Sequence, residues 1–136
     1  MQKSLYTIFE EIDNLSTQKE KVEALATHRH NSVLFNIINL ALNPKVKWLL
    51  PEGDPPYKPC EFDVEGRFLS EIRRLYLFLE GGSPNLNQVK REKLFIDILE
   101  SIDPNDAKLL LAMKDKKMPF KSINKTIAKK AFPNIW

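Results

Sequence analysis

The chain has 136 residues, of which 43% are hydrophobic and 29% charged, with a formal net charge of +3. This is the composition of an ordinary globular domain with one core. No apolar run reaches the 18 residues that would indicate a membrane span. The N-terminal stretch MQKSLYTIFEEID has acids where a secretion signal would have an apolar block, so neither a membrane span nor a secretion signal is expected. The single cysteine, Cys60, excludes an internal disulfide, so a reducing cytoplasm is expected.

The first third of the chain has the apolar spacing of three helices. Thr17 and Glu20 have the spacing of a capping box, which predicts the start of a second helix that runs to about Arg29. Asn31 can cap a third helix, which must end before Pro44. The residues expected to face inward are Leu5, Ile8, Phe9 and Ile12 in the first helix, Val22, Leu25 and Ala26 in the second, and Leu34, Ile37, Ile38 and Ala41 in the third.

The stretch from Pro44 to Asp63 contains five prolines and Gly53. Repeated prolines remove backbone donors and fix φ, so neither a helix nor an inner strand can run through it. We predict an ordered loop that crosses the domain, which is either a cover for the core or a functional loop. Its apolar anchors are Trp48, Leu49, Leu50, Tyr57 and Phe62.

Helical spacing resumes at Glu65 and predicts four more helices, so the chain is expected to be a single all-α domain of about seven helices over residues 1–136. The fourth helix should end at Gly81 and Gly82, and the fifth covers 86–102. Asp103 followed by proline is a strong start signal for the sixth, and Ser122 can cap a short seventh. The expected inward residues are Phe68, Leu69, Ile72, Leu75, Tyr76 and Leu79, then Phe95, Ile98, Leu99 and Ile102, then Leu109, Leu110 and Met113, and finally Ile123, Ile127 and Ala131.

Motifs that would indicate an enzyme are absent from the sequence. There is no phosphate-binding glycine loop, no GxGxxG pattern and no CxxC pair. His28 and His30 are two positions apart, so on a helix they point to different faces and make a poor metal pair. We therefore expect no catalytic residues, no metal site and no cofactor.

The C-terminal end carries most of the positive charge of the chain. Eight lysines and a single acid lie between Lys108 and Lys130, although the whole chain has a net charge of only +3, so the remainder is net acidic. Such a concentration is either a solvated face or a surface for phosphate groups. Lys121, Lys125 and Lys129 recur every four residues and are expected on one helix face, with Ser122 placing the helix amides near a phosphate.

The C-terminal pattern KDKKMPFKSINKTIAKKAFPNI resembles the end of the N-terminal helical DNA-binding domain of phage-type ATP-dependent DNA ligases. In that family a basic turn leads to a short helix, followed by an aromatic residue, proline and a small residue. The opening EIDNLSTQKEKVEAL resembles the two-helix start of the same domain. The chain also resembles a group of small, uncharacterised proteins of cyanobacterial viruses, through LLPEGDPPYKP, RRLYLFLEGG and KREKLFIDILE.

The ligase resemblance implies binding to the phosphate backbone of duplex DNA without ligation. The catalytic KxDG motif of those enzymes is absent. Where the family has a glycine before the last helix, this chain has Met118 to Ser122, so contacts there would depend on side chains. The viral resemblance implies a location in the cytoplasm of an infected bacterial host.

Two functions stay open at this point. The first is a non-enzymatic viral accessory protein that binds duplex DNA non-specifically through a lysine-rich C-terminal hairpin. The second is a helical module that binds a viral replication protein or a host protein, using the loop at Pro55 to Tyr57 and the terminal Trp136. The candidate nucleic-acid-binding residues are Lys114, Lys116, Lys117, Lys121, Ser122, Lys125, Lys129, Lys130, Arg73 and Arg74.

Overall fold

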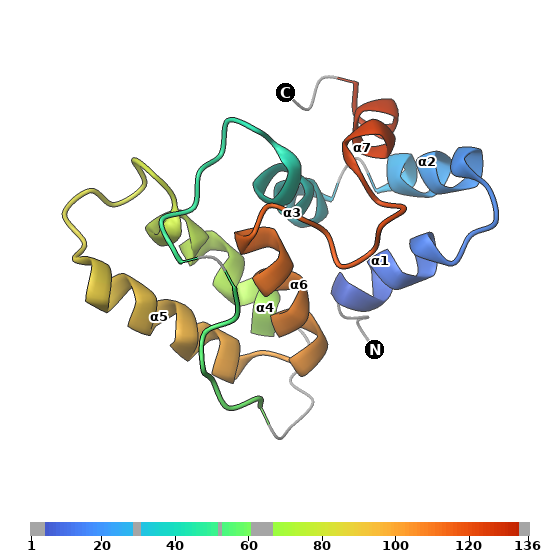
Figure 1. The fold of residues 1–136 in the computed structure, drawn as a ribbon. Coiled ribbons are helices and arrows are strands. Elements are labelled where there is room, and N and C mark those ends of the chain that lie inside the picture. The colour runs from blue at the N-terminus through green and yellow to red at the C-terminus, as the bar shows by residue number, and fades with distance from the viewer. Residues whose placement is uncertain (1–4, 29–30, 52, 61–66, 134–136) are drawn as a thin grey trace.

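The computed structural model describes residues 5–28, 31–51, 53–60 and 67–133. This part of the chain contains seven α-helices and one 3-10 helix and no strand, with one isolated bridge between Trp48 and Leu79. The prediction of an all-α protein is confirmed over these residues (Figure 1). The helices are α1 (Leu5–Asp13), α2 (Gln18–Thr27), α3 (Ser32–Leu42), α4 (Arg67–Glu71), η1 (Ile72–Phe78), α5 (Gln88–Ser101), α6 (Pro104–Lys114) and α7 (Lys125–Ala131).

Three of the predicted start signals are confirmed in atomic detail. The Thr17 hydroxyl accepts a hydrogen bond from the Glu20 amide at 3.1 Å, and the Asn31 side chain accepts from two amides of α3. Asp103 caps α6 through the amide of Asn105, with proline at the first helical position. Each side chain supplies an acceptor to amides that have no partner within the helix, so local sequence alone fixes these starts.

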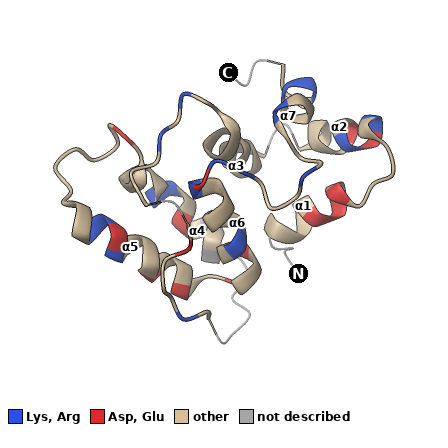
Figure 2. Ribbon diagram, in the orientation of Figure 1, with Lys and Arg blue, Asp and Glu red and all other residues tan. Residues whose placement is uncertain are grey.

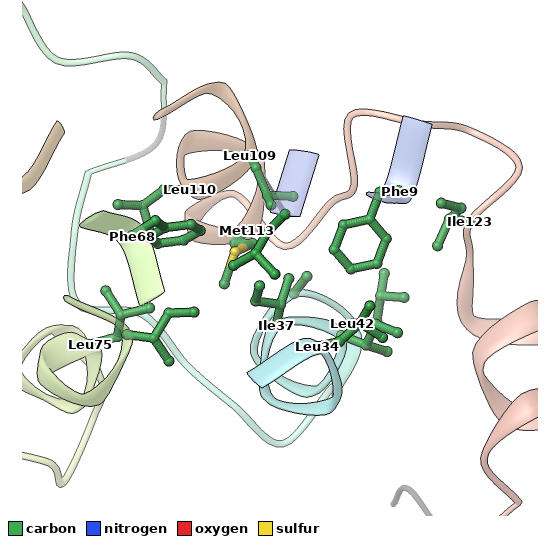
Figure 3. Close-up of a cluster of buried hydrophobic side chains, with 14 of the residues drawn as sticks. Phe9, Leu34, Ile37, Leu42, Phe68, Leu75, Leu109, Leu110, Met113 and Ile123 are labelled. Atoms are coloured by element: carbon green, nitrogen blue, oxygen red, sulfur yellow. The ribbon is translucent and has the colours of Figure 1, made fainter. Parts of the chain in front are cut away.

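Helix α6 is the centre of the core and packs against α1, α3 and α5. In Figure 3 its buried residue Leu110 lies beside Phe68 of α4, and Met113 lies near Ile37 of α3. Phe9 of α1 enters the same cluster from the other side, close to Ile123 (Figure 3). The core therefore joins the first, middle and last parts of the sequence.

A second packing unit places the C-terminal helix against the N-terminal half of the chain. Helix α7 lies along α2 (Figure 1) and buries Ile127, Ala128 and Ala131. Phe132 meets Phe35 of α3 edge to face, with ring centroids 5.6 Å apart. This packing holds α7 firmly on the body while its opposite side faces solvent.

The predicted fourth helix is wrong in form. The structure has one short α-helix followed by seven residues of 3-10 helix, which has three residues per turn. Burial follows that period, because Ile72, Leu75 and Phe78 are buried, whereas Tyr76 is 53% exposed. The side chain of Leu69, like Glu65, lies outside the described residues.

The predicted end at Gly81 and Gly82 is wrong, because the helical element ends at Phe78 with Leu79 extended, and the two glycines lie in the turn that follows. Gly81 has a φ of +82°, and a Cβ on Gly82 would lie 1.9 Å from the Tyr76 carbonyl oxygen. Any side chain at Gly82 would clash with the backbone, so the close turn requires glycine there.

The predicted cap of the last helix is also wrong. Helix α7 begins at Lys125 and is capped by Asn124, whose side chain accepts a hydrogen bond from the Ile127 amide at 3.1 Å. Ser122 lies before the helix and donates its hydroxyl hydrogen to the Asp13 carboxylate of α1. The serine thus ties the segment before α7 to the first helix.

The proline-rich loop is attached to the helices by hydrogen bonds along its length. The Trp48 indole donates to the Leu40 carbonyl at 3.0 Å, and the Lys58 amide donates to the Glu100 carboxylate at 2.7 Å. Gly53 donates to Asp115 at 3.3 Å. Phe62, one of the expected anchors, lies outside the described residues.

Candidate nucleic-acid interface

Lys114 is a structural residue and cannot take part in a nucleic-acid surface. Its side chain is only 1% exposed. The ammonium group donates to the carbonyls of Pro51 and Gly53, each at 2.8 Å, and to the Asp115 carboxylate at 2.6 Å. A buried ammonium with three acceptors is fully used, since it has three hydrogens to donate. Lys114 instead fixes the proline-rich loop to the end of α6.

Lys116 is also committed to the fold. It has a φ of 62°, in the left-handed region where glycine usually ends a helix. Its ammonium group donates to the carbonyls of Leu40 and Asn43, at 3.2 and 2.5 Å, at the C-terminus of α3. A cation there satisfies free carbonyls and the helix dipole.

The electrostatic surroundings of Lys116 show that a second cation is close. Partial burial lowers the pKa of the Lys116 ammonium below 10.5, and the like charge of Lys125 lowers that pKa further. The start of α7 therefore lies beside the C-terminus of α3.

The two candidate arginines lie on the other side of α3, in η1. Both are exposed. Arg74 forms an ion pair with Glu71 at 2.9 Å, and Arg73 lines a groove with Tyr76 and Leu40. The segment between α4 and α5 that carries both arginines lies apart from α7 in Figure 2. The structure does not bring Arg73 and Arg74 together with the C-terminal lysines.

Arg91, a further basic residue of α5, is buried and serves the fold. Its guanidinium donates to the carbonyls of Leu77, Ser83 and Leu86, and to the Gln88 side chain at 2.6 Å. These bonds hold the turn between η1 and α5, so Arg91 has no free face for a phosphate.

Five of the predicted lysines are exposed and lie on α7 or on the segment that leads into it. Figure 2 shows basic stretches along this part of the chain, whereas α1 is acidic at its C-terminal end and α5 has mixed charges. Since Lys121 precedes the helix, it does not share a helical face with Lys125 as the spacing predicted. We call this set the C-terminal basic surface: Lys117, Lys121, Lys125, Lys129 and Lys130.

Ser122 does not prepare a phosphate site at the start of α7. Its hydroxyl is bonded to Asp13, and the amide of Ile127 is already taken by Asn124. The structure therefore does not support the predicted phosphate site at the N-terminus of α7, and attraction to a phosphate would come from side-chain charge alone.

Two exposed residues, Lys45 near this surface and Tyr76 on the other side of α3, were not predicted as candidate site residues. Lys45 is exposed and follows Asn43, whose carbonyl binds Lys116, so it adds a cation from the loop after α3. Tyr76 was expected in the core and is exposed beside Arg73. No local signal identifies Lys45, because more than 70 residues separate it from the C-terminal lysines.

No group of three or more His, Cys, Asp or Glu side chains in the described ranges could hold a metal ion. His30, one of the two histidines, lies outside those ranges. Among the described helices, none has the length and apolar character needed to cross a membrane.

A family model described as "Family of unknown function (DUF6433)" covers residues 8–119, which is most of the chain and ends before α7. No curated protein and no solved structure matches the chain.

Proposed function

The chain belongs to the DUF6433 family of unknown function, and we propose that it binds duplex DNA non-specifically through the C-terminal basic surface. Binding would be electrostatic, between lysine ammonium groups and backbone phosphates, without a catalytic step. The proposal is for a viral accessory protein that acts in the cytoplasm of an infected bacterium, and the resemblance of the sequence to proteins of cyanobacterial viruses supports it. No cofactor is needed for it.

The observation that carries the proposal is the exposure of five lysines at one end of a body that is otherwise net acidic. Lysines this close together on one short segment repel each other. Burial is the larger cause of the lowered pKa of Lys116, and the like charge of Lys125 lowers that pKa further. Binding to a polyanion relieves that repulsion. Lysine favours backbone contact over bidentate base recognition, which supports sequence-tolerant binding.

The test is a salt titration of binding to a fluorescent DNA duplex. About three to five phosphate contacts predict that log K falls with log salt with a slope of roughly −3 to −4. Replacing Lys117, Lys121 and Lys125 together by Gln should flatten the slope by about 3 and weaken binding equally for all sequences.

The matched control removes the same charge elsewhere. Lys90, Lys93 and Lys108 are exposed and lie on α5 and α6. Their triple replacement by Gln should leave the slope nearly unchanged, apart from a small effect of net charge. Equal losses in the two triple variants, or no binding by the wild type at low salt, would reject the proposal.

A second candidate function is protein binding, and one specific observation favours it. Tyr76 is 53% exposed and lines a groove between α3 and η1 with Arg73 and Val33. Tyrosine and arginine are the residue types that dominate binding energy at protein interfaces. Crosslinking from position 76 in infected-cell extract should then be lost in Arg73→Glu and persist in the triple lysine variant.

A further inference from the structure

A cavity of about 280 Å³ lies between the proline-rich loop and helix α5. Its apolar wall consists of Leu50, Pro55 and Pro56 from the loop and of Phe95 and Ile96 from α5. A volume of this size, at the lower end of those of small-molecule sites, has room for one ring or one branched chain.

The wall of this cavity is built on a fixed support. Lys114 holds Pro51 and Gly53 through their carbonyls, and the Gly53 amide donates to Asp115. The ammonium of Lys114 lines the cavity, but all its hydrogens are used and its charge is balanced by Asp115 at 2.6 Å. The cavity is therefore preformed, and Lys114 offers no free charge to an anionic ligand.

Two carboxylates lining the cavity, Asp54 and Glu92, are not balanced in this way. No hydrogen bond or ion pair joins either one to another residue of the described ranges, and Glu92 is half-buried on α5. Asp54 is exposed, and its negative charge adds to the effect of burial in raising the pKa of Tyr57. A half-buried carboxylate without a partner favours a cationic ligand.

We propose that this cavity binds a small apolar molecule with one ammonium group. The ammonium would lie between Glu92 and Asp54, and the apolar part would pack against Pro55, Pro56, Phe95 and Ile96. The proposal is independent of DNA binding, because its charges are acidic and would repel a phosphate.

The first test compares three probes of nearly equal shape by NMR titration of the labelled full-length protein. 2-Phenylethylamine carries the ammonium, 2-phenylethanol is neutral, and phenylacetate is an anion. We expect the amine to shift the amides of Asp54, Phe95 and Ile96 and to bind roughly tenfold more tightly than the alcohol, as a charge-assisted hydrogen bond implies. Phenylacetate should bind more weakly still.

The second test removes the charges while keeping the shape. Glu92→Gln and Asp54→Asn should each weaken the binding of phenylethylamine several-fold and leave that of phenylethanol unchanged. Asp97→Asn is the matched control, because this carboxylate is exposed on the same helix and does not line the cavity. An unchanged amide spectrum of each variant establishes that it is folded.

Three results would overturn the proposal. One is the absence of amide shifts around the cavity with phenylethylamine. Another is binding of phenylacetate as tight as that of the amine. The third is an equal effect of Asp97→Asn and Glu92→Gln, which would show that only overall charge matters.

Discussion

At the scale of single residues, Lys114 and Lys117 show how differently neighbouring lysines are used. Lys114 is buried and its ammonium group donates hydrogen bonds to three oxygens, whereas Lys117 is exposed. Both belong to the same run of lysines, and nothing in the residue type separates them. The difference arises because α6 ends between them, and the last turn of the helix directs Lys114 toward the loop at Pro51.

Replacing Lys114 by Met should strongly destabilise the protein. The change leaves the Asp115 carboxylate without its counter-charge and two carbonyls without their donor, which costs about 3–5 kcal/mol. Lys117→Met, the matched control, should change the free energy of unfolding by less than about 0.5 kcal/mol. Urea unfolding measures both, and equal midpoints would contradict the structural role of Lys114.

A second residue-scale prediction concerns the pair of Lys116 and Lys125. Because the like charge of Lys125 disfavours the protonated form of Lys116, Lys125→Gln should raise the pKa of Lys116 toward 10.5. The rise should be partial, since burial is the larger cause. Lys130→Gln should have less effect. An NMR titration of the Lys116 side chain provides the measurement, and no change in Lys125→Gln would mean that the two cations are not neighbours.

The same pKa gives a sign for the pH dependence of stability. The pKa of Lys116 is lower in the folded than in the unfolded state, so folding releases protons between these two values. The contribution of Lys116 to stability is therefore least favourable below its folded pKa and improves as the pH rises toward 10.5.

At the scale of elements, η1 shows that the type of helix decides which side chains are buried. With 3.6 residues per turn, Tyr76 and Leu79 would face the core, as the sequence predicted. With three residues per turn, Ile72, Leu75 and Phe78 do so. Phe78 is fully buried and packs edge to face on Phe95, with centroids 5.3 Å apart.

This geometry predicts that substitutions of two aromatic residues destabilise the protein to very different extents. Phe78→Ala should cost about 3–5 kcal/mol, since it opens a cavity in the core. Tyr76→Ala should cost less than about 0.5 kcal/mol, as expected of an exposed position. Chemical denaturation measures the free energy of unfolding of both variants. A larger loss of stability in Tyr76→Ala than in Phe78→Ala would contradict the 3-10 geometry and favour a regular α-helix.

At the scale of the whole molecule, charge is segregated according to its role. Lys114 and Arg91 are internal and join loops to helices, and Lys116 caps α3. The exposed lysines gather on and before α7. The basic end is thus partly a set of structural connections and partly an open surface, and only the second part is available to a partner.

The whole molecule is also predicted to lack nucleotidyl transfer, because the KxDG motif is absent from the sequence. Incubation with labelled ATP and Mg²⁺ should leave the protein unlabelled, with a phage-type ligase as the positive control. A covalent lysine adduct would contradict the prediction and would show that the protein carries out nucleotidyl transfer.

The sequence by itself determined the elements that depend on local chemistry. The starts at Thr17, Asn31 and Asp103 follow from side chains that cap nearby amides, and the apolar spacing identifies most of the core. The all-α class follows from the same signals. These interactions involve residues within a few positions of each other, so no tertiary information is needed to predict them.

Only the tertiary structure decided which charged and polar side chains are bonded within the fold. Lys114 is used by a loop about 60 residues earlier, Lys116 by the end of α3, and Ser122 by Asp13 at the other end of the chain. The cavity beside α5 likewise needs loop and helix together. Such partners are set by how helices pack, and a lysine has the same sequence signature whether it meets a carbonyl or water.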